Sequence, residues 1–343
     1  MPTGYLRAAY ESIPGNETNT PTLSTKKLFP PLQSFAPKLG ASPMERDDEL
    51  RNQDEPLSVL PDVYEPGWEY ASRLYPDLLG FFLKLACGAP TSTAGDGIIT
   101  DPDSTVVPVG VTKHVWTAPF GPSGASPLTA QFDVAYRDQG VFFKAKGAAA
   151  SELSIQNPET GGSTIAASGP AAYLDRQSDP SLSPTYETLA IRPFTRADLT
   201  LPTWLTGSGT HENFDLTIQN PVELVRSMGI KSRYPDVVEK ANEGPIVVRG
   251  SIPQRQLDVD DFDALKNATG FAAKARWVSD SLIGATSFPY KLFVEMSNCQ
   301  YVDGDAEELG NKRRHGGSFD WKSTTASSGS TTITLLNATA SYA

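Results

Sequence analysis

Residues Leu128–Gly147 read LTAQFDVAYRDQGVFFKAKG, and this stretch decides the fold class. Apolar and polar side chains alternate from its first residue to Tyr136, which is the period of a β-strand with one buried face. The turn sequence RDQG follows, and a second apolar run begins at Val141. The stretch therefore predicts an antiparallel β-hairpin, with Gln131 and Asp133 on its polar face.

Similar alternating segments recur along the chain between clusters of Gly, Pro or Asp. Gly147 and the three alanines after it predict a bend or bulge before the strand Glu152–Gln156. The other predicted strands are Phe214–Gln219, Ile246–Ile252, Phe271–Val278, Lys291–Tyr301 and Thr331–Leu336. The sequence thus predicts a mainly β protein, an antiparallel sandwich or barrel with a few short helices.

Two of these strands have nearly the same sequence at their ends. Leu153–Pro158 reads LSIQNP and Leu216–Pro221 reads LTIQNP. In each copy the Asn-Pro pair stops an amphipathic strand, because Pro cannot donate to a sheet ladder. The tripeptide YPD also occurs twice, but at a different separation, so no single period fits both echoes. A tandem repeat is therefore not supported.

Two short segments carry helical signals around that YPD tripeptide. In Leu74–Gly88, LYPDLLGFFLKLACG, apolar residues recur every three or four positions, with Asp77 as the predicted N-cap and Gly88 as the predicted end. The second copy, YPDVVEKA at Tyr234–Ala241, predicts another helical turn.

An acidic run predicts a further helix, because its aspartates suit the positive end of a helix dipole. They are Asp258, Asp260 and Asp261, and the segment continues through Lys266. A calcium loop of the EF-hand type is a poor fit, since Asp263 stands where that loop needs Gly and Thr269 where it needs Glu.

The first 44 residues show no sustained period and are rich in Pro, Thr and Ser. We expect them to form an extended arm, disordered alone and ordered on a partner, in front of a β domain at 45–343. Its first forty residues hold four bases against Glu11 and Glu17, a net of +2, so an acidic neighbour would attract it. The bases are Arg7, Lys26, Lys27 and Lys38.

Composition argues against several function classes. The 343-residue chain is 39% hydrophobic and carries a net charge of −11, which opposes tight binding to nucleic acid or to an anionic membrane. Cys87 and Cys299 are too few for a disulfide framework and are predicted to be buried thiols. With no secretory signal and no long apolar run, we expect a soluble protein made in a cytoplasm, without membrane insertion.

Signals for catalysis or metal binding are weak. The histidines His114, His211 and His315 lie about a hundred residues apart, without metal-ligand spacing, and His114 is predicted to be a half-buried edge residue. No nucleophile elbow, Walker loop or dinucleotide fingerprint is present. The basic run Lys312–His315 is interpreted as a solvated loop. We expect no cofactor and no enzymatic activity, although scattered carboxylates leave a β-sandwich hydrolase as an alternative.

Four segments together resemble the tail tube proteins of long-tailed bacteriophages. They are LYPDLLGFFLKLACG, HVWTAPFG, SPLTAQFDVAYRDQGVFFKAKGAAASELSIQ and ITLLNATASY. The resemblance extends from about Pro43 to Ala343 and is most specific over Tyr75–Gln156. It implies a structural virion protein, assembled in the bacterial cytoplasm into the virion tail, with no catalytic residue.

The resemblance further implies hexameric rings that stack into a hollow tube, through which double-stranded DNA passes without specific binding. Tape measure, tail terminator and distal tail proteins would be its partners. An acidic lumen would let phosphate pass without sticking, so we predict that acids outnumber bases there, with Gln131 and Asp133 as candidates. A capsid, decoration or distal tail protein, or a carbohydrate-binding domain, are the other interpretations.

Overall fold

The computed structural model describes residues 4–24, 33–45, 59–120, 127–158, 161–179, 191–202, 210–211, 214–226, 233–241, 245–256, 259–306, 316–324 and 331–342. Within these ranges strands dominate, and they are accompanied by two α-helices and one 3-10 helix. Each strand pairing is antiparallel. The predicted mainly β, antiparallel fold class is confirmed.

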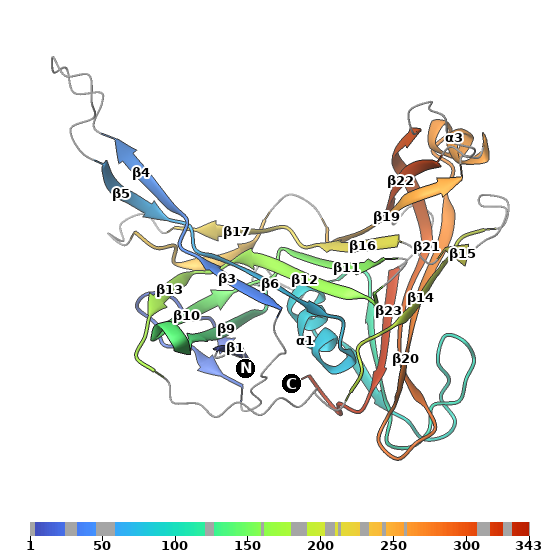
Figure 1. Ribbon diagram of the computed structural model, residues 1–343, viewed down its shortest axis with the longest axis horizontal. Coiled ribbons are helices and arrows are strands. Elements are labelled where there is room, and N and C mark those ends of the chain that lie inside the picture. Colours follow the sequence, from blue (N-terminus) through green and yellow to red (C-terminus); the bar gives the residue numbers. More distant parts are fainter. Residues whose placement is uncertain are drawn as a thin grey trace.

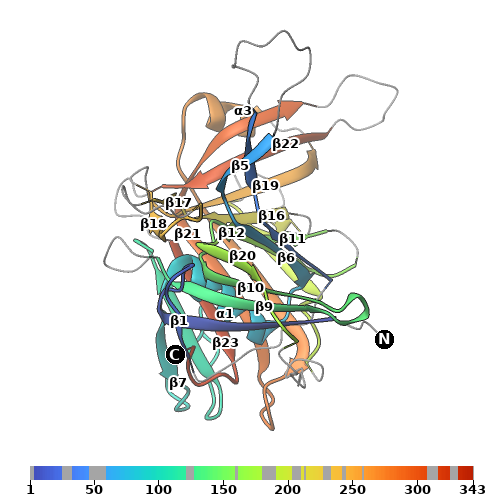
Figure 2. The ribbon, with the colours of Figure 1, turned by 90° about the vertical axis from the view of Figure 1, so that its left-hand side faces the viewer.

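The predicted hairpin forms the centre of a five-stranded sheet. Its strands, in spatial order, are β13 (Tyr173–Arg176), β10 (Val141–Ala148), β9 (Thr129–Tyr136), β1 (Gly4–Ile13) and β2 (Thr22–Leu23). The 3-10 turn η1 (Arg137–Gln139) joins β9 to β10 and ends at Gly140, whose φ of 61° suits glycine. The β9–β10 register shifts between Ala145 and Ala148, which confirms the predicted bulge at Gly147. Figure 2 shows β1, β9 and β10 side by side.

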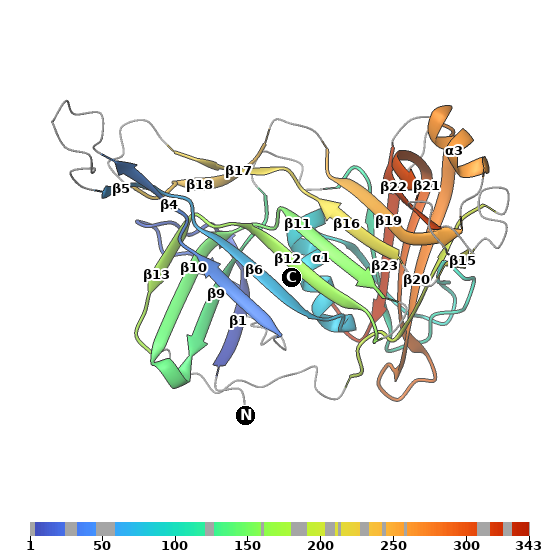
Figure 3. The same ribbon diagram turned by 45° about the horizontal axis from the view of Figure 1, so that its top comes forward.

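A second sheet of fourteen strands forms most of the remaining structure (Figure 3). Eleven strands follow one path: β15 (Thr210–His211), β14 (Arg196–Thr200), β20 (Phe271–Leu282), β21 (Pro289–Ala306), β22 (Gly316–Ser323), β19 (Val247–Gln256), β16 (Phe214–Gln219), β11 (Glu152–Asn157), β12 (Thr164–Pro170), β6 (Gly67–Arg73) and β3 (Ser34–Lys38). Three more form a branch: β23 (Thr331–Asn337), β8 (Thr112–Thr117) and β7 (Thr91–Ala94).

The branch exists because β21, with 18 residues, is long enough to change partners along its length. Its first part, Lys291–Met296, pairs with β23, whereas Cys299–Ala306 pairs with β22. The opposite edge of β21 pairs with β20. One continuous strand therefore carries both arms of the sheet.

Two hairpins lie outside these sheets. Strands β4 (Ala41–Glu45) and β5 (Val59–Tyr64) pair and project away from the body at the upper left of Figure 1. Strands β17 (Val222–Val225) and β18 (Val237–Lys240) form the other.

Helix α1 (Pro76–Cys87) lies between the two sheets and joins their cores (Figure 1). Proline stands in its first turn, and the Gly88 N–H donates to the Lys84 carbonyl at its end. Its aromatic side chains contact both sheets: Tyr10 of β1 stacks on Phe81 at 4.5 Å between ring centroids, and Tyr70 of β6 stacks on Phe82 at 4.8 Å. Such aromatic packing dominates core energetics. The acidic run forms the predicted helix, α3 (Val259–Lys266). It lies beside the end of β20 and β21 that is remote from the β20–β21 turn (Figure 1).

The two echoing sequences lie side by side. Strands β11 and β16 pair antiparallel, with Leu153 opposite Ile218 and Ile155 opposite Leu216. Both asparagines that follow are buried, and the Asn220 Nδ2 donates to the Ala150 carbonyl at 2.9 Å. The echo thus marks two neighbouring strands that bury the same pattern on the same face.

Three local predictions were wrong, and two of them concern helices. The N-cap of α1 is Tyr75, without a side-chain cap, and Asp77 lies inside the first turn. The segment YPDVVEKA contains strand β18, because its β-branched Val237 and Val238 pair with Val225 and Leu224 of β17. Long-range pairing here overrides a local helix signal.

His114 is fully buried rather than half-buried at an edge, since β8 lies between β7 and β23. The predicted cap Asp258 lies outside the described residues, as do His315 and the basic run at 312–315. Cys87 and Cys299 are free and buried, as predicted.

The segment predicted as an arm is largely built into the sheets. Strand β1 pairs with β9 from Gly4 to Glu11, and β3 pairs with β6. Tyr5, Leu6, Ala8 and Ala9 are buried in the process. The expected boundary at residue 44 falls within β4 of the β4–β5 hairpin. The alternation in β1 was missed because small alanines on both faces hide the period of two.

Candidate assembly surfaces

Two predicted lumen residues and one predicted arm residue belong to one buried network. Arg7 lies opposite Asp133 in the β1–β9 register, and its Nε donates to Asp133 Oδ2 at 2.7 Å. The Gln131 Nε2 donates to Asp133 Oδ1 at 3.0 Å, and Gln177, which follows β13, donates to the same oxygen at 3.3 Å. Three side chains thus cover one carboxylate, and the Arg7 guanidinium neutralises its charge.

Gln131 and Asp133, the two predicted lumen candidates, are buried within the subunit. Their exposed fractions are 5% and 1%. Both sit on the face opposite the α1 core, as the alternation requires, but Gln177 and Arg7 close over that face. The polar groups of Gln131 and Asp133 bind one another, and Asp133 also binds Arg7, within the subunit.

Glu11 forms a second buried polar site on β1. Its carboxylate accepts the backbone N–H groups of Gly147 at 3.1 Å and Gly15 at 3.2 Å, and the Thr129 hydroxyl at 2.8 Å. Burial raises the pKa of this carboxyl, and those hydrogen bonds oppose the rise. Glu11 therefore ties the chain after β1 to the bulge of β10.

The remaining predicted arm bases divide into two groups. Lys38 of β3 forms an exposed ion pair with Glu69 of β6. Lys26 and Lys27 lie outside the described residues. The structure therefore brings Arg7 and Lys38 to acidic partners within the same chain, in different sheets.

The fourteen-stranded sheet, called here the long sheet, carries a row of polar residues across four neighbouring strands. Asp215, Ser251, Asp320 and Asp303 stand opposite one another across β16, β19, β22 and β21. They line an open hollow of about 500 Å³ that also includes Arg249. Asp215 is the least exposed of the acidic residues that line this hollow, and burial raises the pKa of its carboxyl group.

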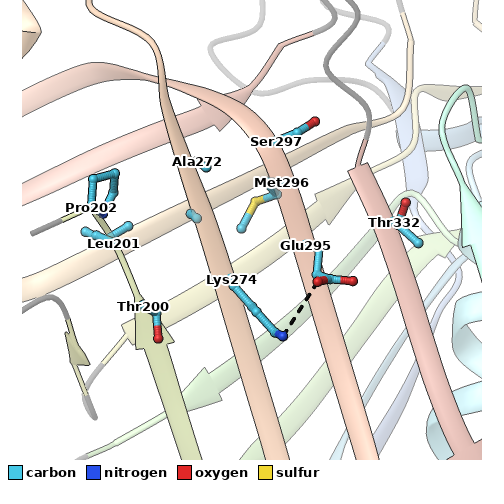
Figure 4. Close-up of a pocket in the computed structure, with 10 residues that line it drawn as sticks. Thr200, Leu201, Pro202, Ala272, Lys274, Glu295, Met296, Ser297 and Thr332 are labelled. Atoms are coloured by element: carbon cyan, nitrogen blue, oxygen red, sulfur yellow. Dashed lines mark ion pairs between the residues drawn. The ribbon is translucent and has the colours of Figure 1, made fainter. Parts of the chain in front are cut away.

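A second open hollow, of about 510 Å³, lies over the other arm of this sheet (Figure 4). Thr200, Lys274, Glu295 and Thr332 form a row across β14, β20, β21 and β23, and Lys274 pairs with Glu295 at 3.7 Å. Small side chains such as Ala272 and Ser297 form the adjoining part. Both hollows are shallow features of a sheet face rather than enclosed sites.

Residues 95–111, between β7 and β8, form a loop that is fixed to the sheet by charge. The Lys291 Nζ of β21 contacts Asp101 Oδ2 at 2.6 Å, and both groups are buried. Asp103 pairs with Lys274 at 3.1 Å and with Arg276 at 2.8 Å. Sequence reasoning missed this site, because its acids and bases lie about 170–190 positions apart.

The buried histidine belongs to a structural network at the C-terminal end. His114 Nδ1 lies 2.7 Å from Ser92 Oγ, and its Nε2 lies 2.8 Å from the Thr339 carbonyl. The Tyr342 hydroxyl donates to the Asp77 carbonyl at 3.2 Å, and the Lys84 ammonium donates to the Tyr342 carbonyl. These contacts hold the segment after β23 against α1, and Tyr342 and the buried residues of α1 belong to the same hydrophobic core.

The described residues contain no group of three or more His, Cys, Asp or Glu side chains placed to hold a metal ion. None of the helices in these ranges is long and apolar enough to cross a bilayer. Burial raises the pKa of the Cys299 thiol to about 12 and raises that of Cys87 as well, so both thiols stay protonated at neutral pH.

Comparison with known proteins identifies the family. A family model described as phage tail tube protein matches residues 2–341, which is nearly the whole chain. No curated protein matches it significantly. The match extends over both sheets, α1 and the C-terminal segment, and it confirms the resemblance seen in the sequence. The chain is a structural, non-enzymatic component of the virion tail and belongs to the phage tail tube protein family.

Proposed function

We propose that the protein assembles into hexameric rings, which stack into a tube around a lumen that conducts the phage genome. The family match carries this proposal. The open sheet edges support it: among the described strands β3 pairs only with β6, and β7 pairs only with β8. All four residues of β7 are exposed. Edges of this kind are closed when neighbouring subunits add strands in a ring.

The register of β7 fixes which of its backbone N–H groups point away from β8. The Gly95 N–H donates to the Val111 carbonyl, so Thr93 and Thr91 donate to β8 and the N–H groups of Ser92 and Ala94 point outward. Tape measure, tail terminator and distal tail proteins would complete the tail, as the family implies.

We further propose that acids outnumber bases on the lumen wall, because a negative wall repels DNA phosphate and lets the genome slide. The polar face of the long sheet offers exposed Asp303 and Asp320 for such a wall. This assignment replaces Gln131 and Asp133. Double-stranded DNA would pass without specific contacts.

Electron microscopy and mass photometry of the purified, concentrated protein test the proposal. We expect stacked rings with a central hole, and a ring mass six times the 36.9 kDa of the subunit. Closed shells or a persistent monomer would instead favour a capsid or decoration protein. A reconstruction of the tube with a basic lumen wall would exclude the proposed conduit electrostatics.

The variant Ala94→Pro removes one outward N–H of β7, whereas Ala94→Ser at the same exposed position keeps it. If β7 closes the ring, the proline variant stays monomeric with an unchanged unfolding midpoint and the serine variant assembles. Equal assembly of both would place the ring contact on another edge.

A further inference from the structure

We propose that the loop 95–111, called here the anchored loop, is a preformed docking element that packs against the opposite end of a second copy of this chain. The inference rests on the proposed function and deepens it, because it assigns the contact between stacked subunits to particular side chains. It follows from three properties of the loop: its internal order, its attachment to the sheet and its outward apolar residues.

The internal order of the loop centres on the Asp101 carboxylate. Its Oδ1 accepts the backbone N–H groups of Asp103 at 2.9 Å and Thr105 at 2.8 Å. The Asp101 N–H donates to the Thr105 carbonyl, and Thr100 and Val106 form a β-bridge. These bonds fix the loop before any partner arrives, which lowers the entropy cost of docking.

The attachment uses the cations of two neighbouring strands. Lys291 of β21 meets the second Asp101 oxygen, while Lys274 of β20 donates to Asp103 and to the Pro102 carbonyl. Inward apolar residues, Val107 and Val111, are buried beneath the loop. The loop is thus part of the folded body and not a flexible tether.

The outward apolar residues lack an explanation within the subunit. Ile98, Val109 and Val106 are exposed by 79%, 73% and 50%. Gly110 lies near Thr286 in the β20–β21 turn, and Leu282 beside that turn is also exposed. Ordered loops that hold several large apolar side chains in water mark interaction sites.

We assign the partner as a second copy because exposed apolar residues also lie at the other end of the same strands. Strands β20 and β21 run from this turn to α3, where Phe262 and Val302 are exposed (Figure 1). Contact between unlike ends of identical chains is heterologous and repeats without closing, which generates a stack. A tube protein requires a contact of this kind along its axis.

Thiol cross-linking between copies tests the assignment. The wild-type cysteines are buried, so an introduced surface cysteine is the accessible thiol among the described residues. We expect the double variant Val109→Cys/Phe262→Cys, treated with a short bis-maleimide after assembly, to give ladders of three or more covalently linked subunits. Gln139→Cys/Phe262→Cys is the matched control, with an exposed residue on the β9–β10 turn, and should give no ladder.

The outcomes separate this inference from the proposed function. Tubes that form while the Val109 and Phe262 variants fail to link would overturn the docking assignment and leave the tube function intact. A wild-type chain that stays monomeric at high concentration would overturn both. Ladders from soluble stacks without a ring would uphold the docking contact and contradict the hexameric tube.

A second experiment tests the buried Asp101–Lys291 ion pair that attaches the anchored loop to β21. In Asp101→Asn/Lys291→Met, both partners of the buried pair become uncharged, so the sheet keeps no unpaired buried charge. We expect faster amide hydrogen exchange confined to residues 98–107 and at least a tenfold higher concentration for assembly. Unchanged assembly despite the faster exchange would show that preorganisation of the loop does not contribute.

Discussion

Strands β9 and β16 carry the same alternation of apolar and polar residues, yet they occupy different environments. In β16, Phe214, Leu216 and Ile218 are buried, while the residues between them stay partly exposed on the polar face of the long sheet. In β9 every residue except Tyr136 is buried. The apolar faces of both strands pack on the interior, so the difference lies in what covers the polar face.

The cover on β9 consists of charged and amide groups that satisfy one another. Arg7 arrives from β1, Gln177 from the chain after β13, and Glu11 binds backbone N–H groups nearby. The comparison shows that a period of two predicts which side chains share a face but not whether that face meets water. Burial of a polar face requires partners from distant positions.

The largest effect should come from removing the charge at the centre of the covered face. Asp133→Ala leaves Arg7, whose side chain is only 13% exposed, without its partner, so we expect a loss of about 3–5 kcal/mol in the free energy of unfolding. Glu69→Ala, in the exposed Lys38–Glu69 pair, should cost less than about 1 kcal/mol. Urea denaturation of both variants measures the contrast, and equal losses would contradict the burial of this network.

The next largest contrast concerns two glycines with nearly the same φ angle. Gly147 and Gly140 have φ values of 59° and 61°, but only Gly147 is crowded: an added Cβ would lie 2.5 Å from the Gly15 carbonyl oxygen. Gly140→Ala should cost about 1–2 kcal/mol from conformation alone. Gly147→Ala should cost about 1–3 kcal/mol more because of overpacking. Thermal unfolding of the pair measures the difference, which would vanish if the chain after β1 did not lie on β10.

A smaller effect separates two glutamines on polar faces. Gln131→Ala removes a hydrogen bond to a buried carboxylate and should cost about 1.5–3 kcal/mol. Gln156 of β11 is exposed on the long sheet, and Gln156→Ala should change stability by less than about 0.5 kcal/mol. Matched unfolding curves decide this, and a costly Gln156→Ala would mean that the polar face of the long sheet is also covered.

The smallest expected effect is a change in how the free energy of unfolding depends on pH. Because burial raises the pKa of Glu11 above its ordinary value of 4.5, the folded chain binds this proton more tightly than the unfolded chain. The contribution of Glu11 to stability is therefore full below pH 4.5 and is lost as the pH rises through the raised value. Relative to the wild type, Glu11→Gln should gain stability as the pH rises from about 4.5 to 7. A pH-independent difference between the two proteins would contradict the raised pKa.

The sequence by itself determined several local elements and the family. Alternation specified the β9–β10 hairpin, glycine and alanines specified its bulge, and the apolar spacing of Leu74–Gly88 specified α1, because each depends on neighbours within a few positions. It also ruled out a repeat, although it could not show that LSIQNP and LTIQNP are paired strands.

Only the tertiary structure decided which faces are covered and which residues meet. The sequence could not place β1 in a sheet, because the partner of Arg7, Asp133, lies 126 positions away along the chain. The same holds for Asp101 and Lys291, which fix the anchored loop across 190 positions. Charges of this kind carry no periodic signal. The pairing of Arg7 with Asp133 follows from the β1–β9 register, and that of Asp101 with Lys291 from the contact between the anchored loop and β21.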